Sequence, residues 1–215
     1  MSVYLQATNP IGGLTKLEFP YTPQIEYSTD VKYDTYNTTH TNYQLYGYTR
    51  SENPSINLNC KFSAHTSQHF KLSEFAIRFL RTYTKMNYGR LDNDRGQPPR
   101  ILRFFAHGNS MFNNVPVVIN KFSMTLPEDV DYIKGSIGDK FNVLTKGDFF
   151  RSGQVPTNKL ADKQVSLDSV DGTIYLPAIF QISIGLYMQQ NMYKAVNEFK
   201  LEDFAQGKLS SKGYI

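Results

Sequence analysis

A strand, a helix and two more strands follow one another within residues 55–126, and they constrain the fold more than any other feature of the chain. Apolar and polar residues alternate over 56–64, which is typical of a strand with one buried face. Apolar residues then recur at helical spacing over 72–83. Half-buried strands are expected again at 101–106 and 115–126. This order predicts a sheet whose apolar face is covered by one helix.

Aromatic residues on the apolar faces of these elements indicate where the core lies. A further strand is predicted over 174–188, where every even position is apolar. Thr66 or Ser67 is suited to cap the start of the helix, and Gly89 its end. By strand parity or helical phase, we expect these side chains to share one core: Phe62, Phe75, Phe79, Phe122 and Phe180.

Residues 25–49 predict a long hairpin with tyrosines on both faces. Two strands flank a polar tip at 37–42, and tyrosine, threonine and asparagine dominate the segment. Such strands bury neither face well on their own core, so the hairpin either lies against a neighbouring molecule or stays exposed to solvent. If the chain assembles into a ring, the side chains expected at the contact are Tyr27, Tyr33, Tyr43 and Tyr46.

The 215 residues are expected to form a single domain. Proline and glycine favour an irregular arm over 1–24. The sheet and helix occupy 50–127 and 173–190, separated by an insertion at 128–172 with little periodicity. A weak helix is predicted in the C-terminal segment, 191–215.

Composition excludes several classes of protein. The net charge of +4 is mild and its lysines and arginines are scattered, which favours an ordinary surface over a nucleic-acid footprint. A single cysteine, Cys60, excludes an intramolecular disulfide framework and a multi-cysteine zinc site. The start resembles no secretory signal and no apolar run has the length of a membrane helix, so we expect folding in a reducing cytoplasm.

Candidate chemical sites are weak. His65 and His69 are four residues apart, but His65 precedes the helix and no metalloprotease glutamate lies between them. Residues 92–96 resemble a calcium loop with misplaced glycine and no closing glutamate. The acidic residues of 128–131 lack a partner histidine or nucleophile nearby in sequence. The sequence therefore predicts no catalytic residue, cofactor site or metal site, and no enzyme.

Several short motifs resemble one family. They are Arg-Ser-Glu-Asn-Pro at 50–54, Phe-Ser-Ala-His-Thr at 62–66, Asn-Asn-Val-Pro-Val-Val-Ile at 113–119, Asp-Val-Asp-Tyr at 129–132 and Leu-Pro at 176–177. Together they resemble the tail-tube-like baseplate proteins of contractile-tailed bacteriophages, the tube initiators beneath the tail tube. The resemblance covers 50–132 and 173–190, and its motifs are packing and turn signatures.

The resemblance implies an antiparallel β-sandwich or barrel of tail-tube type with one flanking helix. It also implies a hexameric ring around a channel in which DNA is only passing cargo. The partners would be further copies of the chain, the baseplate hub and the tail tube, with no membrane. The protein would be assembled in the host cytoplasm and located in the tail or baseplate of the virion.

Three alternatives remain open from the sequence. The chain could be the tail tube subunit itself, or a small enzyme that uses the acidic loop at 128–131. It could also be a cytoplasmic single-stranded nucleic-acid-binding protein with tyrosines as a stacking platform. That last class needs basic residues among the aromatic ones, and between Tyr27 and Tyr48 there is only Lys32.

Overall fold

The computed structural model describes residues 2–88, 96–108, 111–136 and 173–215. Its strands are β1 (Tyr4–Ile11), β2 (Leu14–Glu18), β3 (Gln24–Ser28), β4 (Val31–Tyr36), β5 (Leu45–Ser51), β6 (Ser55–Ser63), β7 (Leu102–Ala106), β8 (Phe112–Thr125), β9 (Tyr132–Ser136), β10 (Thr173–Pro177) and β11 (Ile179–Met188). The helices are α1 (Ser67–Tyr83), α3 (Met192–Glu198), α4 (Leu201–Ala205) and the 3-10 turn η1 (Ser210–Lys212). The expected mainly β class with a flanking helix is confirmed.

Seven strands form one antiparallel sheet in the order β2-β1-β7-β8-β11-β6-β3. The alternation seen in the sequence sets its buried face. In the β6–β11 pair, Phe180 lies opposite Phe62 and Ile182 opposite Cys60. The two phenylalanine rings stack with centroids 5.6 Å apart. Cross-strand pairs of this kind stabilise a sheet through side-chain packing.

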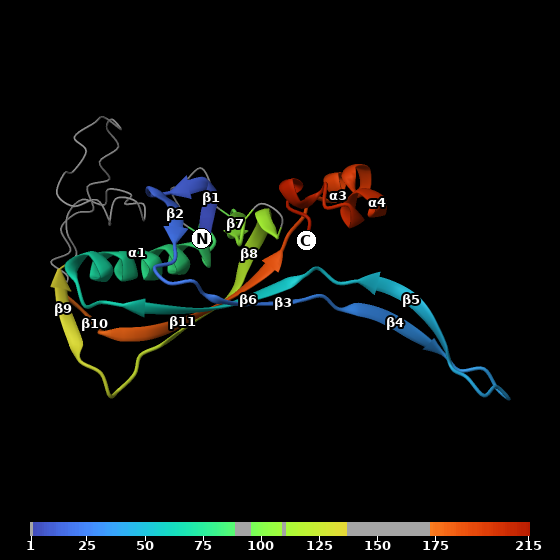
Figure 1. Cartoon of the computed structure of the whole chain (residues 1–215), viewed down its shortest axis with the longest axis horizontal. Helices are drawn as coiled ribbons and strands as arrows, with labels where there is room; N and C mark the ends of the chain where they lie inside the picture. Colours follow the sequence, from blue (N-terminus) through green and yellow to red (C-terminus); the bar gives the residue numbers. More distant parts are fainter. Residues whose placement is uncertain (1, 89–95, 109–110, 137–172) are drawn as a thin grey trace.

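The sheet curls around α1. The helix contacts β6 near one edge of the sheet, β8 in the middle and β2 at the other edge. In Figure 1, β1 and β2 lie on one side of α1, and β6 and β11 lie on the other. Among the described strands β2 and β3 remain at the two ends of the order, so the sheet is curved and open.

The first 24 residues do not form the irregular arm predicted for them. They form β1 and β2, and Leu5 and Leu17 are fully buried. The glycines at 12 and 13 join these strands with φ of +56° and +81°. A two-residue hairpin turn of type I′ has positive φ at both positions, which glycine adopts without steric cost. The glycines therefore turn the chain within the sheet.

Helix α1 starts as predicted and ends earlier than predicted. Thr66 caps it, because its hydroxyl accepts a hydrogen bond from the amide of His69 at 3.2 Å. The last helical residue is Tyr83, well before the predicted end near Tyr88. After the helix, the Asn87 carbonyl accepts a hydrogen bond from the Gly96 amide at 2.7 Å, and the Asn87 amide donates to the Gln97 carbonyl at 3.1 Å. Gly89, the predicted cap, lies outside the described residues.

The five phenylalanines expected in the core differ in how deeply their side chains are buried. Phe62, Phe79 and Phe180 are buried, whereas Phe75 and Phe122 are partly buried and pack against the same cluster. Phe79 packs its ring against Tyr83, with centroids 4.5 Å apart.

The insertion lies mostly outside the described residues, because 137–172 are not part of them. Its two ends pair as β9 and β10, with Leu176 opposite Ile133. In place of one weak C-terminal helix, the chain forms α3, α4 and η1, and η1 contacts β8.

Replacing Phe79 with alanine tests whether the helix is held by the sheet. We expect Phe79→Ala to lower the free energy of unfolding by about 3–5 kcal/mol, since it removes a fully buried ring. Lys71→Ala, on the exposed side of the same helix, should change it by less than about 0.5 kcal/mol. Denaturant melts followed by circular dichroism measure both. Equal, small losses in the two variants would contradict the packing described.

Candidate assembly interface

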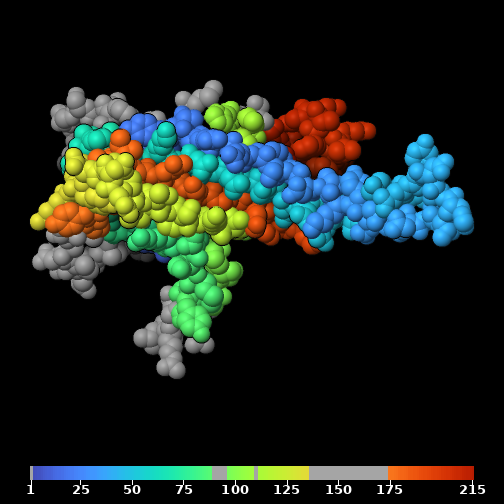
Figure 2. Space-filling view, turned by 90° about the horizontal axis from the view of Figure 1, so that it is seen from below, coloured from blue at the N-terminus to red at the C-terminus, as the bar shows by residue number. Residues whose placement is uncertain are grey.

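The β4–β5 hairpin stands away from the body of the protein. It forms a separate two-stranded sheet, closed at its root by a 2.8 Å hydrogen bond from the Glu52 amide to the Asp30 carbonyl. It extends beyond the sheet and helices in Figure 1, and Figure 2 shows it as the projection at the right. Every residue of β4 is exposed, and so is every residue of β5 except Gly47.

Three tyrosines share one face of this hairpin. Tyr33 lies opposite Tyr48, and Tyr46 lies opposite Thr35. Side chains of directly opposed residues, and of residues two apart on one strand, point to the same face. Tyr33 and Tyr48 meet edge to face with ring centroids 6.0 Å apart. We call Tyr33, Tyr46 and Tyr48 the tyrosine face.

The opposite face carries a smaller apolar surface. Tyr36 lies opposite Leu45, and its ring crosses Gly47. A Cβ atom at Gly47 would come within 2.5 Å of the Tyr36 ring, so a larger residue at this position would have to displace that ring. Both faces of the hairpin therefore expose apolar side chains.

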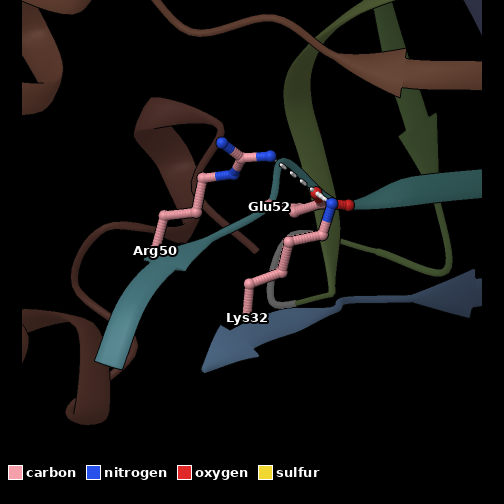
Figure 3. Close-up of polar contacts among 3 residues, drawn as sticks. All are labelled: Lys32, Arg50 and Glu52. Carbon is pink, nitrogen blue, oxygen red and sulfur yellow. Dashed lines mark hydrogen bonds and ion pairs between the residues drawn. The ribbon is translucent and has the colours of Figure 1, made fainter. Parts of the chain in front are cut away.

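Two cations at the root of the hairpin contact one carboxylate. The Lys32 ammonium and the Arg50 guanidinium both contact Glu52 Oε1, at 2.5 and 3.4 Å (Figure 3). The hydrogen bond from Lys32 is the main reason why the pKa of Glu52 lies below its ordinary value. The two cations nearest the tyrosine face thus share one carboxylate, which joins the start of β4 to the residue after β5.

The four tyrosines predicted at an interface lie in three different places. Tyr33 and Tyr46 belong to the tyrosine face. Tyr43 lies in the 37–44 tip and is 84% exposed. Tyr27 belongs to β3, which pairs with β6 in the main sheet, and its ring packs edge-on against Phe112 at 6.2 Å. The hairpin therefore begins at β4, and its predicted start at residue 25 is wrong.

Sequence reasoning left Tyr48 out of the predicted contact. Lys32 lies opposite Arg50, whereas the next residue, Tyr33, lies opposite Tyr48. Thr49 is therefore an extra residue in β5, a β-bulge. The bulge lies between Tyr48 and Arg50, so it leaves Tyr46 and Tyr48 on the same face and offsets only the residues at the root of the hairpin. The tyrosine content of the segment was the available signal, and it did not reveal the register.

The weak chemical sites of the sequence do not come together. His65 is exposed before α1, while His69 lies in its first turn with Nδ1 3.3 Å from the Ser63 hydroxyl. Glu128, Asp129 and Asp131 are exposed. Within the described ranges no group of three or more histidine, cysteine, aspartate or glutamate residues is arranged to hold a metal ion. Asp92 and Asp94 lie outside those ranges.

One ion pair on α1 has a largely buried carboxylate. Glu74 is paired with Arg78 one turn away, yet only 8% of the glutamate is exposed. Burial raises the pKa of Glu74, and the arginine opposes that shift.

No protein-family profile matches this chain, and none of the curated proteins matches it in sequence. In the part of the chain that the structure describes, no helix is both long and apolar enough to cross a membrane.

The ion pairs at the hairpin root predict a local effect of charge. Because the pKa of Glu52 is lowered in the folded state, its stabilising contribution is present above the ordinary carboxyl pKa and is lost as pH falls through the lowered value. Glu52→Gln should therefore speed amide hydrogen exchange in β4 and β5 and leave β6 and β11 unchanged.

Glu26→Gln, an exposed change on β3, is the matched control and should leave exchange in β4 and β5 unchanged. Exchange read by mass spectrometry at neutral pH measures both variants. If the hairpin of Glu52→Gln exchanges at the wild-type rate, the ion pairs do not hold its root.

Proposed function

We propose that this protein is a structural component of a contractile phage tail, a ring-forming tube initiator that joins the baseplate hub to the tail tube and encloses the DNA channel. It is not an enzyme in this proposal. The observation that carries it is the β4–β5 hairpin, which projects from a well-packed body and exposes apolar side chains on both faces.

An isolated two-stranded hairpin is marginally stable in water, because it buries too little apolar surface to offset its ordering. A neighbouring molecule that closes over the tyrosine face would supply the missing burial. Tyrosine suits this role, since its ring packs like an apolar side chain while its hydroxyl tolerates solvent in the free subunit.

The motifs behind the resemblance occupy positions where the fold needs particular residues. Residues 50–54 run from the end of β5 to the start of β6, and 62–66 run from β6 to the cap of α1. In 113–119, Asn114 adopts a φ of +55° inside β8, a conformation that asparagine tolerates better than most residues. These positions support the proposed family.

The ion pairs at the root of the hairpin argue against a role as a nucleic-acid stacking platform. Such platforms combine aromatic side chains with cations available to phosphates. Here Lys32 and Arg50 both contact Glu52, so the tyrosine face lacks a strongly basic border.

Self-assembly of the full chain tests the proposal. We expect light scattering after size exclusion, with electron microscopy, to show ring-shaped oligomers that form with or without oligonucleotide. Replacing Tyr33, Tyr46 and Tyr48 together with serine should abolish the rings and shift the free energy of unfolding of the subunit by less than about 1 kcal/mol, because all three side chains are exposed.

Tyr193→Ser, on the exposed surface of α3, is the matched control and should assemble normally. Mass spectrometry of virions from the phage that encodes the chain should find it in the tail. A monomer that binds oligonucleotide, or rings that persist in the triple variant, would contradict the proposed role of the hairpin.

A further inference from the structure

A groove of about 1060 Å³ runs along α1, between the β1–β2 turn, the end of β8 and β10. Its helical wall is made of residues three or four apart, from Glu74 through Arg78 to Thr82, so they form one stripe of the helix. At the rise of an α-helix this stripe is about 12 Å long, which matches about four residues of an extended chain. In Figure 1, α1 and β10 lie away from the β4–β5 hairpin, so the groove is separate from the tyrosine face.

The floor of the groove is apolar. Met124 and Ile174 are partly buried and pack against the core, and Ile77 contributes from the helix. Leu126, directly after β8, also lines the groove and is 46% exposed. A concave apolar floor favours a ligand that brings apolar side chains of its own.

The strand β10 borders the groove with its edge. Three consecutive residues of this strand, Ile174, Tyr175 and Leu176, line the groove. Because neighbouring residues of a strand point to opposite faces, a run of three places the edge of the strand along the groove. β10 pairs with β9 on one side and with no described strand on the other. The main-chain groups of such an edge can pair with an added strand.

The rim of the groove is positively charged. Of the described residues that line it, four are arginine or lysine and one, Glu74, is acidic. Glu74 is paired with Arg78, so its charge is compensated inside the groove. Arg81 and Lys85 are exposed on the rim. Carboxylates beside them would be attracted, whereas a cationic ligand would be repelled.

We propose that this groove binds an acidic, extended segment of another protein, which adds as a strand to the edge of β10. Apolar side chains of the segment fill the floor, and its carboxylates pair with Arg81 and Lys85. The site goes beyond the proposed function and does not depend on it, because binding of the segment needs no second copy of the chain.

A fluorescently labelled peptide of alternating aspartate and isoleucine tests the chemistry on the full chain. Fluorescence anisotropy should show saturable binding that weakens as salt rises, because salt screens the charges of the rim. The peptide with lysine in place of aspartate should not bind. The peptide with glycine in place of isoleucine should bind roughly tenfold more weakly or less, because it cannot fill the floor. An aspartate–isoleucine peptide that shows no saturable binding up to about 1 mM overturns the proposal.

Charge reversal at the rim tests where the peptide lies. Arg81→Glu together with Lys85→Glu should weaken binding roughly tenfold or more. Lys61→Glu together with Lys71→Glu is the matched control, because both lysines are exposed outside the groove and the net charge changes equally. The control should bind within about threefold of wild type at physiological salt, since distant charges are screened. Equal losses in the two double variants overturn the proposal.

Thermal melts separate loss of binding from loss of folding. Both double variants should melt within a few degrees of wild type, because the replaced side chains are exposed. If Arg81→Glu with Lys85→Glu fails to fold, Arg81→Gln with Lys85→Gln takes its place and should still weaken binding at least about threefold.

Hydrogen exchange tests whether the peptide adds to β10. Bound peptide should slow amide exchange in β10 and leave β4 and β5 unchanged, because only the β10 edge gains main-chain partners. Binding that leaves exchange in β10 unchanged overturns strand addition and with it the proposal.

Competition and assembly separate the remaining outcomes. An oligothymidine that displaces the labelled peptide at a lower concentration than the unlabelled peptide would assign the rim to phosphates and overturn the proposal. Rings whose subunits do not bind the peptide overturn the groove and leave the proposed function standing. A monomer that binds the peptide supports the groove and contradicts the ring.

Discussion

The burial of α1 within the curl of the sheet is the interaction on which the other features depend. Its last residue, Tyr83, fixes the far edge of the sheet as well, because the hydroxyl donates to the Leu14 carbonyl at 2.7 Å and accepts from the Ile11 amide at 3.2 Å. Both partners flank the β1–β2 turn. Burial raises the pKa of Tyr83, whose hydroxyl is protonated at neutral pH even at the ordinary value and can donate. The helix and its last side chain together hold the sheet in its curved form.

This packing makes the two ends of the sheet different. At the β2 end, the strand lies against α1 and its turn is bonded to Tyr83. At the β3 end, the chain continues into a hairpin whose two strands pair with each other and with no other described strand. An edge strand that leads into an exposed hairpin is where pairing with another chain is easiest. Under the proposed function, the interior packing of the subunit would thus leave the β3 side of the molecule open to a neighbouring copy.

Elements in which apolar residues recur at a regular spacing could be predicted from sequence. Features set by strand register or by a distant contact could not. The alternation of apolar and polar residues predicted β6 and β11, and the helical spacing of apolar residues predicted α1, because each element buries one face in the core. The β1–β2 hairpin was missed because Gly12 and Gly13 suggest a break in the chain and a tight turn equally well. The tyrosine face was found only in part, because tyrosine content alone does not show which residues of β5 lie opposite Tyr33, and the bulge at Thr49 separates that register from the root of the hairpin.

The same bulge bears on the geometry of any assembly. It lies at the root of the hairpin, beside the Lys32–Glu52 pair, and a bulge bends a strand and increases its twist. The direction in which the hairpin leaves the sheet is therefore set by one extra residue and one ion pair, both outside the core. For heterologous contacts, the angle between neighbouring copies decides between a closed ring and an open filament. The strength of the tyrosine contacts would then govern whether copies associate, while the root of the hairpin would govern how many copies close the ring.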